Sequence, residues 1–121
     1  MIVTIAKTFT FDAAHWLPQV ADGHKCKRMH GHTYRVEVLC HGPIGPRTGW
    51  LIDYADIEVA WRPLATLLDH HVLNEIPGLE NPTTERLAPW ILAALVQSDI
   101  GDFVRSVRVY ESSTTWCQVD R

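Results

Sequence analysis

The chain opens with hydrophobic residues at every second position, the period of a strand with one buried face. From Ile2 to Phe11 the inward series is Val3, Ile5, Phe9 and Phe11, with threonines between them. The same alternation returns from His32 to Cys40, through Tyr34, Val36 and Val38. It appears again at Phe103, Val107 and Val109, and a short last strand is predicted over Thr115–Asp120. Because successive strand side chains point to opposite faces, these segments predict four half-buried strands.

Two segments between the strands carry hydrophobic residues at helical spacing instead. The first follows Asp53, which can cap a helix, and has Ile57, Trp61, Leu64 and Leu68 on one face. The second begins at Thr83 or Thr84 and has Leu87, Ile91, Ala94 and Leu95 on one face. Pro63 predicts a kink or an early end of the first helix, and Pro89 weakens the second near its start. Stretches rich in Gly and Pro predict loops at 41–49 and 76–82.

The order β–β–α–α–β–β predicts an α+β fold, a four-stranded antiparallel sheet with two helices on one face. With 121 residues the chain has the length of a single domain, residues 1–121. A small sheet of this kind exposes two edge strands. Their unpaired backbone groups favour pairing with other subunits.

Composition limits the classes of function that the protein can have and indicates the cell compartment in which it works. A net charge of −3 and 46% hydrophobic residues do not favour nucleic-acid or membrane binding. No apolar run has the length of a membrane span, and the first residues lack the pattern of a signal peptide. The three cysteines are not spaced as a disulfide framework, which predicts a reducing cytoplasm.

Histidine is concentrated near the start of the second predicted strand, in the segment CKRMHGH. His30 and His32 are two apart, so both imidazoles point to one face. His15 ends the first strand and joins them if the two strands form a hairpin. Three neutral imidazoles suit zinc and leave a fourth position for substrate or water. The alternatives are a pair of surface histidines, or a closed structural site with Cys26 as fourth ligand.

Two further groups have both a structural and a functional interpretation. Asp69, His70 and His71 end the first helix, where a histidine is favoured by the helix dipole. An Asp–His pair can equally act in proton transfer, because the carboxylate orients the imidazole. Glu111 follows a strand and is by default a solvated carboxylate. It becomes interesting only for a pterin or guanine ligand, whose two parallel N–H donors match one carboxylate.

Several segments, taken in order, resemble the 6-pyruvoyl-tetrahydropterin synthase family. They are FDAAH, CKRMHGH, LDHHVLN, ENPTTE and the glutamate of VYES, and the resemblance runs from about Phe9 to Cys117. The resemblance implies that His15, His30 and His32 bind zinc. It also implies that Cys26 is the catalytic base, working with the pair Asp69 and His70, and that Glu111 anchors the pterin.

The spacing CxxxHGH resembles the bacterial branch of the family that forms 6-carboxy-tetrahydropterin in queuosine and 7-deazaguanine biosynthesis. This branch converts 7,8-dihydroneopterin triphosphate with loss of triphosphate and acetaldehyde, which makes the expected enzyme a carbon–carbon lyase. The pyruvoyl-forming branch uses the same residues and remains an alternative, as does a non-enzymatic structural zinc protein. A third branch has a glutamate near the position of Cys26, so the cysteine argues against it.

The resemblance also implies the rest of the pocket and the assembly. Thr83, Thr84 and Glu85 are expected to complete the pterin pocket, and Lys25, Lys27 and Arg28 are candidates for triphosphate contacts. Family members have the T-fold and combine into trimers or dimers of trimers, with active sites at the interfaces. A homo-oligomer, typically a hexamer, is therefore expected here.

Overall fold

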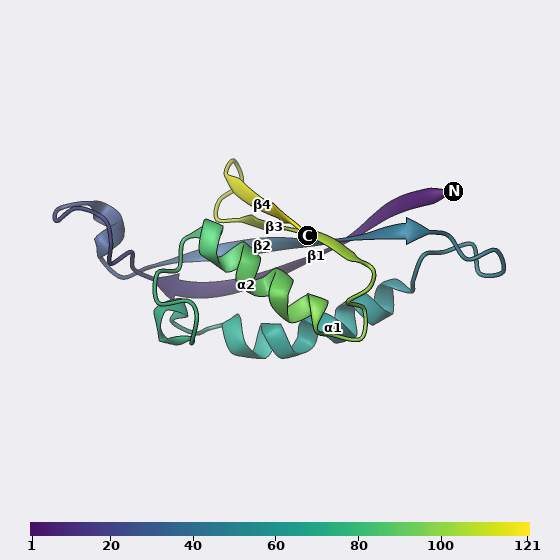
Figure 1. The fold of residues 1–121 in the computed structure, drawn as a ribbon. Helices are drawn as coiled ribbons and strands as arrows, with labels where there is room; N and C mark the ends of the chain where they lie inside the picture. The colour runs from purple at the N-terminus through teal and green to yellow at the C-terminus, as the bar shows by residue number, and fades with distance from the viewer.

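A computed structural model describes residues 1–121 and contains the predicted order of elements (Figure 1). The strands are β1 (Ile2–His15), β2 (His30–Pro43), β3 (Val104–Tyr110) and β4 (Trp116–Asp120). The helices are α1 (Tyr54–Leu68) and α2 (Thr84–Val96), and short 3-10 turns lie at Lys25–Lys27 and Leu73–Glu75. The sequence pattern did not predict these two turns, since three residues carry no periodicity.

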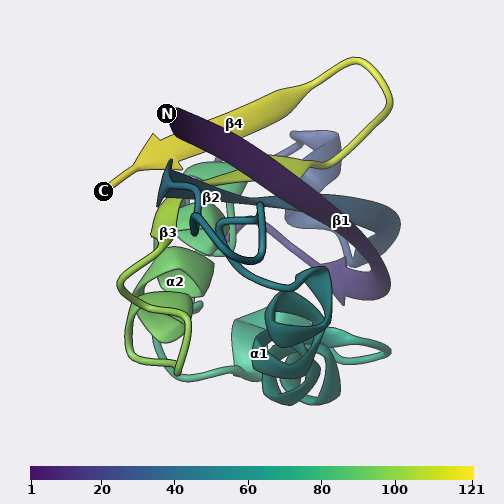
Figure 2. The same ribbon diagram turned by 90° about the vertical axis from the view of Figure 1, so that its right-hand side faces the viewer.

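The four strands form one antiparallel sheet in the order β1-β2-β3-β4, which confirms the predicted fold class. Both helices lie against the same face of this sheet (Figures 1 and 2). Their apolar stripes and the inward side chains of the strands form one core of 23 buried residues. No helix has the length and apolar character needed to span a membrane. The strands β1 and β4 are the two edges of the sheet.

The first two strands are longer than the alternation predicted. β1 continues to His15, and β2 begins at His30 and runs to Pro43, so residues 41–43 belong to a strand rather than to the predicted loop. The two strands pair along their whole length, from Ile2 opposite Pro43 to His15 opposite His30. This pairing stabilises the ends of β1 and β2, where polar residues interrupt the alternation of apolar residues. The hairpin therefore extends beyond the helices (Figure 1). His15 and His30 form the last pair at its end.

Neither proline ends its helix, so the predicted early stop at Pro63 is wrong. α1 continues through Pro63 to Leu68, and α2 continues through Pro89 to Val96. Both prolines are exposed, so the backbone groups that they leave unpaired face solvent. Beyond Pro63, the last turns of α1 bury Leu64 and Leu68, and this burial favours continuation of the helix. Packing thus outweighs the local cost of a proline in these helices.

Candidate metal centre and active site

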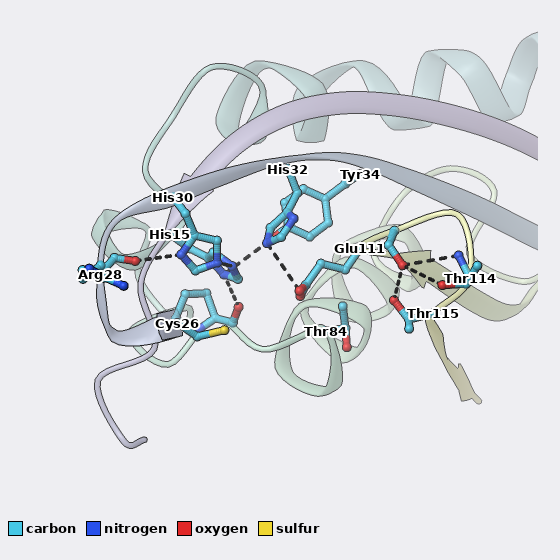
Figure 3. Close-up of polar contacts among 12 residues, drawn as sticks. His15, Cys26, Arg28, His30, His32, Tyr34, Thr84, Glu111, Thr114 and Thr115 are labelled. Carbon is cyan, nitrogen blue, oxygen red and sulfur yellow. Dashed lines mark hydrogen bonds and ion pairs between the residues drawn. The ribbon is translucent and has the colours of Figure 1, made fainter. Parts of the chain in front are cut away.

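The register of the β1–β2 hairpin brings the three predicted histidines together. His15 lies opposite His30, and His32 lies opposite Ala13, so all three side chains point to the helix-covered face of the sheet (Figure 3). Their ring centroids are 4.6–5.1 Å apart. One nitrogen of each ring lies within 4.8 Å of the others. A cluster that can hold a metal ion is thus formed by a single hairpin.

Backbone carbonyls fix which nitrogen of two rings faces the centre. Nδ1 of His15 lies 2.9 Å from the carbonyl oxygen of Pro82, and Nδ1 of His30 lies 2.7 Å from that of Arg28. A carbonyl can only accept, so each Nδ1 carries its proton and donates. In the neutral rings each Nε2 is then a bare lone pair, and these two Nε2 atoms lie 3.0 Å apart. Two facing lone pairs repel each other unless a cation lies between them.

His32 completes the cluster with its buried Nε2, which forms no hydrogen bond of good geometry and lies 3.3 Å from Oε1 of Glu111. Burial lowers the pKa of His32 and of His15 below the ordinary 6.5, outweighing the charge of Glu111, which raises both. Low pKa values keep the imidazoles neutral, the form that binds metal. A buried nitrogen without a well-formed hydrogen bond and two opposed lone pairs on neighbouring rings together fit a metal ion.

The ligand cluster consists of the three histidines and does not include Cys26. Three protein ligands leave a coordination position open, the arrangement of catalytic rather than structural metal sites. Cys26 instead lines an adjoining cavity of about 470 Å³, together with His30, His32 and Glu111. Its position is set by the 3-10 turn, where its N–H donates to Nδ1 of His24 and its carbonyl accepts from the N–H of Leu17. The cavity thus combines a thiol, a carboxylate and two candidate metal ligands.

The three predicted triphosphate residues do not lie together. Lys25 and Arg28 line the cavity beside Cys26. Lys27 turns to the side, where its Nζ lies 2.6 Å from Oδ1 of Asp22. The structure of one chain therefore brings two of the three cations to the site.

The residues at the start of α2 reach the site to different extents. Thr83 caps the helix, and its hydroxyl accepts the N–H of Arg86. Thr84 lies beside Glu111 in Figure 3 and donates its hydroxyl to Oε1 of Glu85, at 2.7 Å. Glu85 itself is exposed. Thr84 is thus near Glu111, but none of the three residues lines the cavity of Cys26.

The predicted Asp–His pair is formed, but it lies apart from Cys26. Oδ1 of Asp69 is 3.0 Å from Nδ1 of His70 and also accepts the backbone N–H of Asp12. These two contacts lower the pKa of Asp69. The backbone N–H of His70 donates to the carbonyl of Asp12 at 2.6 Å, and His70 has a positive φ of 60°.

His70 lines a second cavity of about 470 Å³, together with Asp12 and Thr33 of the hairpin. This cavity shares His32 with the cavity of Cys26, but neither Asp69 nor His70 lines the latter. Within one chain, Asp69 and His70 therefore do not reach the cavity of Cys26.

Sequence reasoning missed the groups that orient the metal ligands. They are the carbonyls of Arg28 and Pro82 and the hydroxyl of Tyr34, which lies 3.3 Å from Nδ1 of His15. Tyr34 is fully buried, and burial raises its pKa well above the ordinary 10.0. Backbone carbonyls leave no signal in a sequence, and Tyr34 fitted the apolar alternation of its strand.

The fold and site define an α+β protein with three clustered histidines, able to hold a metal ion, at the end of a hairpin. Known proteins resemble this chain in sequence and in fold. The profile of the family described as 6-pyruvoyl tetrahydropterin synthase matches residues 4–121. A Synechocystis protein named 6-carboxy-5,6,7,8-tetrahydropterin synthase is 39% identical over 92% of this chain and 88% of its own length. A Pyrococcus furiosus protein named dihydroneopterin monophosphate aldolase is 33% identical over 77% of this chain and 75% of its own.

Solved structures agree on the fold. The chain of Caenorhabditis elegans 6-pyruvoyl tetrahydropterin synthase superposes with a TM-score of 0.92, covering 100% of this chain and 96% of that one at 22% identity. This protein therefore belongs to the 6-pyruvoyl tetrahydropterin synthase family and is an enzyme of that family. The predicted resemblance to the 6-carboxy-tetrahydropterin branch is confirmed by the Synechocystis relative.

Proposed function

We propose that this chain is a zinc-dependent lyase that converts 7,8-dihydroneopterin triphosphate to 6-carboxy-5,6,7,8-tetrahydropterin, with loss of triphosphate and acetaldehyde. The observation that carries the proposal is the open three-histidine cluster beside a cavity that holds both Cys26 and Glu111. The relative named for this reaction supports the choice of product. The resemblance supports a place in 7-deazaguanine and queuosine biosynthesis, and the lack of a disulfide framework supports a cytoplasmic enzyme.

His15, His30 and His32 are the residues that would hold zinc. Neutral imidazoles suit zinc, and a centre with three protein ligands leaves room for substrate oxygens. Bound zinc supplies Lewis acidity, which makes nearby hydroxyl groups of the substrate side chain more acidic. The carbonyls of Pro82 and Arg28 orient the rings of His15 and His30, which supports a preformed site.

Glu111 is the proposed anchor of the pterin ring. Its carboxylate projects into the cavity between His32 and Thr84 (Figure 3). The two oxygens can accept the paired N–H donors of the ring edge in charge-assisted hydrogen bonds. A ring held there directs its side chain toward the histidines, and Lys25 and Arg28 supply positive charge at the cavity wall for the triphosphate.

Cys26 is the proposed base that removes a proton from the substrate side chain, since it is the thiol in this cavity. Asp69 and His70 are proposed to return protons, and in one chain neither residue lines the cavity of Cys26. We therefore propose that a second copy of the chain supplies this pair, in a homo-oligomer such as a trimer or dimer of trimers. The open edges β1 and β4 offer the backbone groups for such an assembly.

The experiment that tests the function is product analysis by mass spectrometry after incubation of the zinc-loaded protein with dihydroneopterin triphosphate. 6-Carboxy-tetrahydropterin with equimolar acetaldehyde and triphosphate is the expected result. Release of triphosphate alone, with a pyruvoyl product, would assign the protein to the other synthase branch. A protein that binds zinc but neither binds nor changes any pterin would overturn the enzyme proposal in favour of a structural zinc protein.

A further inference from the structure

Asn74 pairs its side-chain amide with the backbone of Trp16, the residue that follows His15. Its Oδ1 accepts the N–H of Trp16 at 3.0 Å, and its Nδ2 donates to the carbonyl of Trp16 at 2.8 Å. A carboxamide is the side-chain group that offers an acceptor and a donor side by side. Asn74 thereby satisfies both backbone groups of one residue, as a neighbouring strand would.

On its outer edge, the end of β1 pairs briefly with the backbone of the segment after α1, and the Asn74 contact continues this pairing by one step. Ala14 forms an isolated parallel bridge with Val72, and the N–H of Ala14 donates to the carbonyl of His71 at 3.1 Å. Asn74 then provides the next pair of hydrogen bonds, to Trp16. The backbone of His15 is thus held through both of its neighbours on this side and by His30 on the other.

The same amide also approaches the segment that orients the ring of His15. Nδ2 of Asn74 lies 3.5 Å from the carbonyl oxygen of Glu80, two residues before Pro82. The carbonyl of Pro82 accepts from Nδ1 of His15 at 2.9 Å and so leaves Nε2 for the metal. Asn74 therefore contacts both the end of β1, which carries His15, and the loop whose Pro82 carbonyl fixes the tautomer of His15.

We propose that Asn74 is a positioning residue of the metal centre, which holds His15 in place and its Nε2 toward His30 and His32. This inference rests on the metal site of the proposed function and extends it to a residue that does not touch the metal. Groups that orient a ligating histidine typically affect metal affinity by about 10- to 100-fold. The effect of Asn74 should therefore appear in metal binding itself, without any substrate.

The test measures zinc affinity by competition with a chromophoric chelator, in the wild-type chain and in Asn74→Ala, Asn74→Asp and Asn81→Ala. Asn81 is the matched control, because it lies on the same connection and its side chain makes no hydrogen bond within the chain. Circular dichroism of each metal-free protein shows whether it folds. Asn74→Asp keeps the shape of the side chain but sets an oxygen against the Trp16 carbonyl. Asn74→Ser replaces both variants if neither folds.

If Asn74 positions His15, both Asn74 variants bind zinc about 10- to 100-fold more weakly than the wild type. Asn81→Ala binds zinc as tightly as the wild type. The aspartate variant is decisive because its added negative charge would by itself strengthen cation binding. Folded Asn74 variants with wild-type zinc affinity would overturn the role of Asn74 alone. A wild-type chain that binds no zinc would instead contradict the proposed metal centre.

Discussion

Oε1 of Glu111 lies 3.3 Å from Nε2 of His32, so the proposed pterin anchor is next to a proposed metal ligand. The two groups come from different strands of the sheet, since His32 is in β2 and Glu111 directly follows β3. A metal that takes the lone pair of His32 leaves the carboxylate free to face a ligand. The pairing of β2 with β3 therefore sets the distance between the proposed pterin anchor and the proposed metal ligands.

Removing a histidine ligand should abolish tight metal binding. We expect His30→Ala to lose most of its zinc, since the two remaining imidazoles cannot hold the ion against dilution. Metal analysis of the purified variant is the measurement. His41→Ala is the matched control, because His41 lies on the same strand and its side chain bonds only to Thr4. Full zinc content in His30→Ala would refute the ligand assignment.

Replacing Cys26 should separate catalysis from metal binding. Cys26→Ala is expected to fold and keep its zinc, because the ligand cluster does not include the thiol. Turnover should fall by roughly 10²–10⁴-fold, the contribution of a positioned base. Zinc content and rate are measured on the same preparation, with Cys117→Ala as control, a half-buried thiol outside the cavity. Loss of zinc together with folding would point to a structural cysteine ligand.

Glu111→Gln should weaken pterin binding without affecting the metal. The amide keeps the shape of the carboxylate but sets an NH2 donor against a ring donor. Breaking such a charge-assisted pair in a covered site costs roughly 2–5 kcal/mol. Calorimetric titration with a pterin ligand measures the change, and zinc content serves as the internal control. An unchanged affinity would remove Glu111 from the ligand site.

The stability of the metal-free protein should fall as the pH drops below 6.5. Burial lowers the pKa of His15 and His32 below this value, so the unfolded chain binds more protons than the folded one in acid. The stability from their neutral form is fully present above pH 6.5 and is lost as the pH falls through the lowered folded-state pKa values. Urea unfolding in the presence of a chelator, between pH 5 and 8, measures this. A free energy of unfolding that rises toward pH 5 would contradict it.

Pro63→Ala should stabilise the fold. The alanine regains a backbone N–H for the carbonyl of Val59, within a helix that already continues to Leu68. A proline in a helix interior costs about 3 kcal/mol, and part of this gain is offset by greater freedom of the unfolded chain. We expect a net increase of about 1–3 kcal/mol in the free energy of unfolding. A destabilised Pro63→Ala would mean that the ring itself packs in the fold.

The fold was predictable because its four strands and two helices each repeat a simple spacing of apolar residues. The strand ends were not, because His15 and His30 interrupt that spacing and are held by pairing with each other. The histidine cluster was predictable from HGH and FDAAH, since a hairpin is all that it requires. The location of Asp69 and His70 was not, because it depends on how the loop after α1 docks on Asp12.

The separation of Cys26 from His70 within one chain makes complementation between inactive proteins possible. If each site draws its thiol from one copy and its Asp–His pair from another, Cys26→Ala and His70→Ala are each inactive alone. Mixed by unfolding and refolding together, they would form some sites with one intact half from each parent. Random assembly of equal amounts would restore roughly a quarter of the sites. If sites are shared in this way, the effect of a mutation depends on the whole oligomer, and two differently damaged chains can together form a working enzyme.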